Sequence, residues 1–330
     1  MKKALIFGVT GQDGSYLAEL LLEKGYEVHG LVRKSATGNL SNIQHLIDND
    51  EIINKNFYIQ KGDLLDITSI YRVISDVNPD EIYNEADQDH VGWSYDMAGY
   101  SSDVTAASVA KILEIIKQLN PSIKYFQPCT SNMYGISEEE TQNEDTKFNP
   151  QSPYAISKTF AYYVTRYYRE AFGMHACVGI LFNHESPRRT PEYVTRKITQ
   201  SVARIFLEKQ EKLFLGDISA EIDWGYSPEY MECAWRMLQA EKPDDYIIAS
   251  GETHSVKEFV EEAFKIVNLD YNDFVKTDSS LIRPTKTSPL MGNISKAKKD
   301  LDWYPKTSFK QLVKLMVDED IKKESKHRLV

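Results

Sequence analysis

The alternation of short β-rich runs with longer helix-periodic stretches is the feature that most constrains the fold of this chain. We expect strands at residues 3–7, 27–32, 57–61, 81–84, 124–129 and 176–182. Helix-periodic stretches lie between them, at residues 14–24, 66–77, 101–119 and 152–172. Alternation of this kind implies right-handed βαβ crossovers, which produce a parallel sheet flanked by helices. The chain is therefore predicted to be an α/β protein with a doubly wound parallel sheet.

The second half of the chain has a different texture. Loops rich in proline and arginine separate helices that we expect at residues 195–207, 228–238 and 255–267. A chain of 330 residues also exceeds the usual size of one compact core. We predict that residues 1–183 form mainly the parallel-sheet domain. Residues 184–330 are predicted to form mainly a smaller mixed α/β lobe, with some strands returning to the sheet, and residues 321–330 to form a frayed charged tail.

A glycine-rich turn separates the first expected strand from the first helix. The segment Gly8-Val-Thr-Gly11-Gln-Asp-Gly14 has glycine at every third position. Glycines there allow a tight turn, let the backbone approach a pyrophosphate and leave the phosphates facing a helix N-terminus. Three glycines alone are weak evidence, because an ordinary tight turn can contain them. Their place at the first βα turn predicts a dinucleotide-binding domain of the Rossmann type.

The turn after the second strand indicates which dinucleotide is bound. NAD-binding domains place an acidic residue there to bond the ribose, whereas this chain has Val32-Arg33-Lys34-Ser35. Cations suit the 2'-phosphate of NADP, so NADP is predicted; the alternative is a solvated basic turn. After the third strand, Asp63 is expected either to meet the adenine or to close an Asx turn.

Charge and composition exclude several classes of partner. The formal net charge of -10 argues against nucleic-acid binding, so an anionic ligand needs locally placed Arg and Lys. No stretch approaches the roughly 20 apolar residues of a membrane helix. The cysteines, Cys129, Cys177 and Cys233, are far apart, which predicts buried reduced thiols and no metal site. A cytoplasmic protein fits these features best.

Tyr154 and Lys158 lie four residues apart in the helix-periodic stretch at 152–172. Residues at this spacing share one helix face, so the ammonium stabilises a phenolate and lowers its pKa from about 10 toward working pH. Such a tyrosine can exchange a proton with a hydroxyl as a hydride moves. The pattern is common by chance, but Thr130 at the end of the preceding strand supplies a hydrogen-bonding partner. Together with the phosphate turn, these residues predict a proton-transfer site.

These motifs together resemble the extended short-chain dehydrogenase/reductase superfamily, and more closely the GDP-mannose 4,6-dehydratase family. The resemblance runs from the glycine turn to Arg283-Pro-Thr, nearly the whole chain. Its most specific strings are Phe182-Asn-His-Glu-Ser-Pro-Arg-Arg189 and Val194-Thr-Arg-Lys-Ile198. The resemblance implies an internal redox cycle with NADP. Hydride leaves C4 of the hexose, water leaves across C5 and C6, and the hydride returns to C6, giving a 4-keto-6-deoxy sugar nucleotide.

The resemblance also implies residue roles. Tyr154 is the base for the C4 hydroxyl, Lys158 tunes it and holds the nicotinamide ribose, and Thr130 bonds the substrate hydroxyl. The implied cofactor contacts are Gly8, Thr10, Gly11, Gln12, Asp13, Gly14, Arg33, Asp63, Leu64, Glu85, Gln88, Tyr100, Lys158, His184 and Arg189. The implied contacts of the GDP-sugar are Gln88, Ser131, Asn183, Val194, Lys197 and Arg283. Related enzymes form dimers or tetramers, so a homodimer or homotetramer is implied.

The chain departs from the family pattern at the catalytic turn. Where the family has Thr-Ser-Glu, with the glutamate removing the C5 proton, this chain has Thr130-Ser131-Asn132. An amide cannot act as a general base at neutral pH, so Asn132 cannot replace the glutamate and elimination needs another base.

Three carboxylates are candidates for the missing base. The family's Asn-Leu-Ala-Ala-Gln-Ser-His corresponds here to Asn84-Glu-Ala-Asp-Gln-Asp-His90, which brings in Glu85, Asp87 and Asp89 near the end of the fourth strand. Tyr134, the Tyr154 phenolate or a water could also serve. The alternative is that these carboxylates cap a helix or bind solvent.

Two further departures concern the nucleotide. Ile222 stands before Asp-Trp-Gly where the family has arginine, and Lys286 follows Arg-Pro-Thr where it has an acidic residue. The sugar therefore stays open between GDP-mannose, GDP-N-acetylglucosamine and a GDP-heptose. A C4 epimerase or C4 oxidoreductase is the first alternative function, favoured by the loss of the glutamate. A non-catalytic nucleotide-binding partner is the second, although it would not need the proton-transfer residues.

Overall fold

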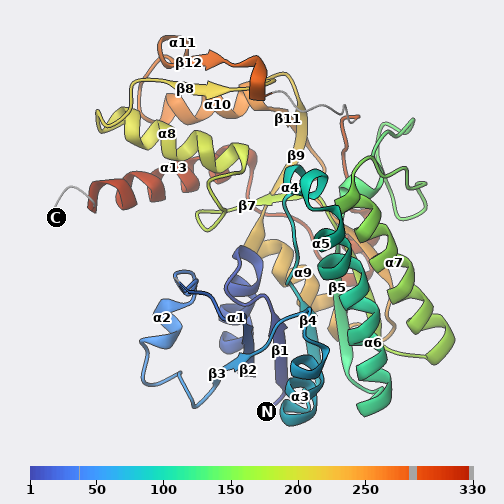
Figure 1. The fold of residues 1–330 in the computed structure, drawn as a ribbon. Helices are drawn as coiled ribbons and strands as arrows, with labels where there is room; N and C mark the ends of the chain where they lie inside the picture. Colours follow the sequence, from blue (N-terminus) through green and yellow to red (C-terminus); the bar gives the residue numbers. More distant parts are fainter. Residues whose placement is uncertain (37, 282–287, 327–330) are drawn as a thin grey trace.

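The computed structural model describes residues 1–36, 38–281 and 288–326, and a seven-stranded parallel sheet forms its centre (Figure 1). The strand order is β10-β6-β5-β4-β1-β2-β3, and every neighbouring pair is parallel. The strands are β1 Lys3–Phe7, β2 Glu27–Val32, β3 Phe57–Lys61, β4 Glu81–Asn84, β5 Lys124–Thr130, β6 Ala176–Leu181 and β10 Asp245–Ile248. The predicted α/β fold with a doubly wound parallel sheet is confirmed.

Helices cover both faces of this sheet because each central strand is apolar on both sides. In β1, Ala4 and Ile6 face one core, whereas Leu5 and Phe7 face the other. The first core is closed by α1 Gln12–Glu23, α9 Ser227–Gln239 and α12 Ser295–Leu301. The second is closed by α3 Ile67–Val77, α6 Ser108–Leu119 and α7 Pro153–Phe172. Shorter helices are α2 Gln44–Ile47, α4 Val91–Asp96 and α5 Ala98–Ser102.

The strand order reverses between β1 and β4, which are neighbours although two strands separate them in sequence. Phe7 and Asn84 pair at their carboxyl ends. Ligands of doubly wound sheets bind outside the carboxyl ends at such a reversal. The glycine turn after β1 and the acidic segment after β4 therefore meet where a cofactor is expected.

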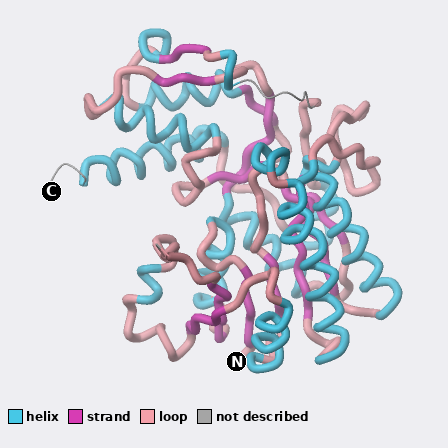
Figure 2. Tube along the Cα trace, in the orientation of Figure 1, coloured by secondary structure: helices cyan, strands magenta, loops and turns pink. Residues whose placement is uncertain are grey.

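A smaller lobe lies above the carboxyl ends of the strands in Figure 1, and Figure 2 shows that it is mostly helical. Its strands are β7 Asn183–Glu185, β8 Leu213–Leu215, β9 Glu221–Tyr226, β11 Thr253–Ser255 and β12 Val275–Thr277. Its helices are α8 Val194–Phe206, α10 Val256–Ile266, α11 Tyr271–Phe274 and α13 Phe309–Lys326. They share a separate apolar core that includes Ile198, Phe259 and Met316. β10 leaves this half of the chain and pairs with β6 in the large sheet.

Two predicted elements differ in the structure. The helix expected at 101–119 is split, because a π-helical segment, Asp103–Ala107, joins α5 to α6. The frayed tail expected at 321–330 is wrong for residues 321–326, which belong to α13; residues 327–330 lie outside the described residues. Helix α13 is anchored because Asp320 forms a buried ion pair with Arg196 and accepts a hydrogen bond from Thr199, with an O–O distance of 2.7 Å.

All three cysteines are buried and free, as predicted. None of the helices within residues 1–36, 38–281 and 288–326 has the length and apolar character that crossing a membrane requires.

Candidate active site

The glycine turn between β1 and α1 is packed closely against neighbouring backbone. Gly8 has a φ of 79°, and a Cβ there would lie 2.5 Å from the carbonyl oxygen of Glu85. A Cβ on Gly14 would lie 2.3 Å from the carbonyl oxygen of Gly8. Helix α1 starts after Gly11, which has no side chain to bond its first N–H groups. The turn therefore offers backbone donors and room for a pyrophosphate, so the residues present fit a dinucleotide.

A buried ion pair joins this turn to the smaller lobe. His184 Nε2 lies 2.9 Å from Asp13 Oδ2, and Ser227 donates a hydrogen bond of 2.6 Å to Asp13 Oδ1. The other ring nitrogen of His184, Nδ1, lies 2.8 Å from the carbonyl oxygen of Phe182. A carbonyl and a carboxylate can only accept, so both ring nitrogens must donate and His184 is an imidazolium.

The pKa values of this pair shift in the directions that a buried ion pair requires. Burial lowers the pKa of His184, but Asp13 outweighs it and the net pKa is raised. Burial raises the pKa of Asp13, but His184, with help from Ser227 and Arg189, outweighs burial and brings that pKa down to about 2. The two residues that the resemblance assigns to the cofactor thus also hold each other.

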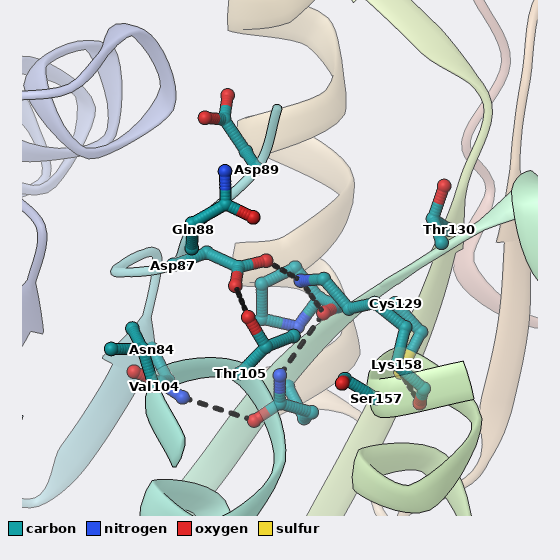
Figure 3. A network of polar contacts seen from close by, with 12 residues as sticks. Asn84, Asp87, Gln88, Asp89, Val104, Thr105, Cys129, Thr130, Ser157 and Lys158 are labelled. Carbon is teal, nitrogen blue, oxygen red and sulfur yellow. Dashed lines mark hydrogen bonds and ion pairs between the residues drawn. The ribbon is translucent and has the colours of Figure 1, made fainter. Parts of the chain in front are cut away.

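The proton-transfer residues lie together and are buried. Tyr154 and Lys158 occupy successive turns of α7, with Lys158 Nζ 5.8 Å from the centre of the Tyr154 ring. Lys158 Nζ donates to the carbonyl oxygen of Pro128 at 2.8 Å (Figure 3) and lies 2.5 Å from Asp87 Oδ2. The lysine is therefore already engaged by the chain on two sides.

The pKa of Tyr154 is raised above its ordinary value, which is opposite to the expected lowering. Burial raises it most, Lys158 lowers it, and Asp87 and Asp89 raise it further. Lys158 does lower the pKa of Tyr154, as expected, but the cost of burying a phenolate is larger. The negative charge of Asp87 also offsets part of the lysine charge.

Asn132, which stands where the family has its glutamate, is hydrogen-bonded to Thr130. The backbone N–H and the side-chain amide of Asn132 both donate to Thr130 Oγ1, at 3.2 and 3.1 Å. These donors occupy the lone pairs of the threonine, so its single hydrogen points elsewhere. A hydrogen bond with Thr130 lowers the pKa of Tyr154, which fits a hydroxyl directed to the phenolic oxygen. Asn132 can thus orient Thr130, but it has no basicity.

The three carboxylates after β4 lie in different environments. Glu85 is half-buried, its buried Oε1 has no hydrogen-bond partner within the described ranges, and desolvation together with Asp13 holds its pKa well above the usual range. Asp87 is buried against Lys158 and accepts a hydrogen bond from Thr105 (Figure 3). The Asp89 side chain is 60% exposed.

Asp89 lies at the open side of the site. It accepts a hydrogen bond of 2.8 Å from the Tyr193 hydroxyl, and one of its oxygens is 3.9 Å from Arg189. Neither Tyr193 nor Thr105 carries a sequence signal that would have selected it. Both lie far from their carboxylate partners in sequence and meet them only in the fold.

Several of the other expected cofactor residues lie in the segments that follow the carboxyl ends of β2, β3 and β4. Arg33 donates to the Tyr100 hydroxyl at 3.0 Å, which brings together two of them from separate segments. Asp63 accepts from the backbone of Leu65 at 3.0 Å, the Asx turn that was the alternative. Gln88 bonds Ser101 at 2.7 Å. Further contacts of the expected residues are Gln12 with His184, the Thr10 carbonyl with Asn42, Arg189 with Glu185, and the burial of Leu64.

The expected substrate residues lie on the lobe side of the site. Ser131 is buried beside Thr130, and Asn183 begins β7. Val194 begins α8, with Lys197 one turn later. Arg283 and Lys286 lie outside the described residues. The Asp-Trp-Gly aspartate, Asp223, is bonded to the backbone N–H groups of Ser250, Gly251 and Gly292, which makes it a structural residue.

Comparison with known proteins places this arrangement in a family. The profile of the family described as GDP-mannose 4,6 dehydratase matches residues 5–316. The chain belongs to the GDP-mannose 4,6-dehydratase family. It is 47% identical to GDP-mannose 4,6 dehydratase 1 of Arabidopsis thaliana, over 100% of this chain and 92% of the relative. It is 45% identical to the Homo sapiens GDP-mannose 4,6 dehydratase, over 96% of this chain and 91% of the relative.

Solved structures of similar fold include other sugar-nucleotide enzymes. A dTDP-glucose 4,6-dehydratase from Bacillus anthracis, solved with NAD, has a TM-score of 0.84 at 24% identity and covers 98% of both chains. One from Streptomyces venezuelae, also solved with NAD, has a TM-score of 0.86 at 20% identity and covers 98% of both chains. These neighbours support the fold. Family membership confirms the expected enzyme class, a GDP-sugar 4,6-dehydratase working with a nicotinamide dinucleotide.

The charged Asp13–His184 pair predicts a pH-dependent stability. A raised pKa in the folded state contributes stability that is complete below the unfolded value of about 6.5 and is lost as pH rises through the folded value. The free energy of unfolding, measured by denaturant titration, should therefore fall as pH rises above about 6.5, and His184→Gln should remove this slope. His45→Gln, at a half-exposed histidine, is the control. Equal slopes in wild type and His184→Gln would contradict the charged pair.

Proposed function

We propose that this dehydratase converts GDP-mannose into its 4-keto-6-deoxy product with bound NADP. The observation that carries the proposal is the convergence of Thr130, Tyr154 and Lys158. Lys158 pairs with Asp87, in the same segment whose backbone at Glu85 packs against Gly8 of the glycine turn. GDP-mannose is preferred over the other GDP-sugars because the relatives at 45–47% identity are named for it. Arg33, bonded to Tyr100 and followed by Lys34, supports NADP over NAD, since both cations suit a 2'-phosphate.

The cofactor would be held by this chain at three places. Its pyrophosphate fits the backbone of Gly8 to Gly14, its 2'-phosphate fits Arg33, and its nicotinamide ribose fits a donor of Lys158 that Pro128 does not use. A bound NADP would supply the hydride acceptor for C4 of the sugar and the hydride donor for C6. The half-buried and buried side chains around the site limit the entry of water during this exchange.

The residues of the chain move the protons. The Tyr154 phenolate accepts the proton of the C4 hydroxyl as the hydride departs. Thr130 is oriented by Asn132, and its hydroxyl donates a hydrogen bond to the phenolic oxygen of Tyr154 or to the C4 oxygen of the sugar. Lys158 favours the phenolate by its charge.

We assign the base of the elimination step to Asp89. Asp87 is engaged by Lys158 and Thr105, and burial together with Asp13 raises the pKa of Glu85 well above its usual range, so neither offers a free carboxylate to a sugar. Asp89 is exposed and close enough to Tyr154 to raise its pKa. A proton α to the 4-keto group is already acidified. Asp89 takes it from C5, and that proton is then available to the hydroxyl leaving C6, so that one water departs without net proton gain.

The function is tested by incubating the protein with NADP and a panel of GDP-sugars. We expect GDP-mannose to give a product that has lost one water, without net consumption of cofactor, as measured by mass spectrometry. Tyr154→Phe should abolish turnover, whereas Tyr71→Phe, at an exposed position of α3, should leave it unchanged.

Two outcomes of this experiment would support another enzyme activity. A product of unchanged mass and inverted C4 would support the epimerase, and stoichiometric accumulation of reduced cofactor without loss of water would support the C4 oxidoreductase. The specific reason to retain these alternatives is Asn132, whose amide is committed to Thr130. Full turnover by Tyr154→Phe would refute the whole site.

The assignment of Asp89 predicts a separation of the two half-reactions. Asp89→Asn should lower kcat by about 100-fold or more, because a general base typically contributes that much. Reduced cofactor should accumulate in a single turnover, seen by its absorbance, because hydride transfer does not need Asp89. Asp96→Asn, at an exposed carboxylate on α4, is the matched control. Unchanged turnover in Asp89→Asn would assign the base elsewhere.

We propose that two copies of the chain associate through α7. Ile156, Phe160, Tyr163 and Tyr167 are 49–57% exposed. Their spacing of four, three and four residues puts them on one face, an apolar stripe that a monomer would leave in water. This contact alone gives a homodimer. A homotetramer, the other expected assembly, would need a second interface between two such dimers.

The α7 interface predicts that Phe160→Glu yields a monomer, measured by size-exclusion chromatography with light scattering. Phe206→Glu changes an aromatic residue that is 47% exposed on α8 of the lobe, and should leave the assembly intact. A monomeric wild type, or an unaltered assembly in Phe160→Glu, would contradict this interface.

We place the enzyme in the cytoplasm. Three buried free thiols fit a reducing compartment, where disulfides are rare.

A further inference from the structure

Asp87 lies in the segment between β4 and α4, and its carboxylate contacts Lys158 of the proton-transfer site. Its side chain is 10% exposed, and that of its partner Lys158 is 5% exposed. Asp87 Oδ2 lies 2.5 Å from Lys158 Nζ, and Asp87 Oδ1 accepts a hydrogen bond from the Thr105 hydroxyl. Figure 3 shows the carboxylate between these two groups. Both of its oxygens are therefore engaged from different elements.

Lys158 Nζ has two partners in the chain. It donates a hydrogen bond to the carbonyl oxygen of Pro128 at 2.8 Å and forms an ion pair with Asp87. The carboxylate is much nearer to the ammonium than the Tyr154 ring centre is, 2.5 Å against 5.8 Å. Coulomb energy falls with distance, so the negative charge of Asp87 cancels much of the field that Lys158 exerts at Tyr154.

Thr105 holds the carboxylate in this position. It lies in the π-helical segment Asp103–Ala107, and its side chain is buried. Such segments are rare and widen the helix by one residue, which redirects the side chains within them. Here the hydroxyl of Thr105 faces Asp87, which keeps the second oxygen satisfied and the ion pair fixed.

We propose that Asp87 is a positioning residue that acts through Lys158 and sets the pH at which Tyr154 accepts a proton from the substrate. The proposal rests on the proposed role of Tyr154 in hydride transfer. The groups that face Tyr154 are Lys158 on its own helix, Asp87 and Asp89 from the segment after β4, Thr130 at the end of β5, and Tyr193 before α8. Asp87 is the buried carboxylate among them.

The sign of the effect follows from the charges. With Asp87 ionised, the ammonium is compensated and the phenolate is less favoured. Asp87→Asn retains an oxygen that can accept from Lys158 but removes the negative charge, so the phenolate forms at lower pH. A shift of about one pH unit is expected from the loss of a like charge at close range.

The first test is the pH profile of single-turnover hydride transfer in the NADP-loaded enzyme, followed by the absorbance of reduced cofactor. The acid limb of the profile should move about one unit lower in Asp87→Asn than in wild type. Thr105→Val keeps both charges, so its limb should stay within a few tenths of a unit of wild type. Asp103→Asn removes one exposed negative charge from the same segment and should leave the limb in place.

Three results would overturn the proposal. One is a lower rate in Asp87→Asn at every pH without displacement of the limb, which is a merely structural effect. The second is an equal displacement in Asp103→Asn, which is a general effect of net charge. The third is a displacement to higher pH. Should Asp87→Asn not fold, as judged by circular dichroism, Asp87→Ser keeps a hydroxyl between Lys158 and Thr105 and carries the same expectation.

A second readout does not depend on activity. Protein labelled with ¹³C at the tyrosine ring carbon that bears the hydroxyl is titrated without cofactor, and the Tyr154 signal is assigned by its loss in Tyr154→Phe. We expect this signal to move toward the phenolate position at lower pH in Asp87→Asn than in wild type. A transition of the Tyr154 signal at the same pH in the two proteins would overturn the proposal. Failure of the dehydratase reaction alone would leave this spectroscopic result standing, so the two failures are distinguishable.

Discussion

The Lys158 ammonium is the charge around which the active site is arranged. It joins α7, which carries it, to the end of β5 through Pro128 and to the segment after β4 through Asp87. A buried charge is tolerated only when partners replace its water, so these contacts fix three separate segments relative to one another. Because Tyr154 is one turn away, the position of the proton-transfer tyrosine depends on the same contacts.

A second buried pair fixes the cofactor side of the site. Asp13 lies in the first turn of α1, beside the glycine turn, and His184 lies in β7 of the lobe, so their contact joins the two parts of the molecule next to the turn at which a dinucleotide is expected. Within the lobe, Asp320 of α13 pairs with Arg196 of α8 and holds these two helices together. Asp13 and Asp320 thus each hold a cation that is built into the fold.

Local signals predicted the sheet, the glycine turn and the tyrosine–lysine spacing, because strand alternation, glycine geometry and helix periodicity are short-range properties. They did not predict the contacts of Asp87 with Thr105 and Lys158, which lie 18 and 71 residues away in sequence. The charged end of α13 was mistaken for a frayed tail because its stabilisation comes from Asp320 meeting a helix over 120 residues earlier. The helix expected at 101–119 is split by the π-helical segment Asp103–Ala107, whose residues carry no pattern that would distinguish it from an ordinary helix.

Asn132 divides the reaction into a part that the site residues support directly and a part that needs a relocated base. The central claim is that the chain still completes both parts on one sugar. The most direct measurement is the fate of deuterium in GDP-mannose labelled at C4. We predict a product that has lost one water and carries the deuterium at C6. Deuterium retained on the reduced cofactor, or a product that keeps its water, would contradict the account.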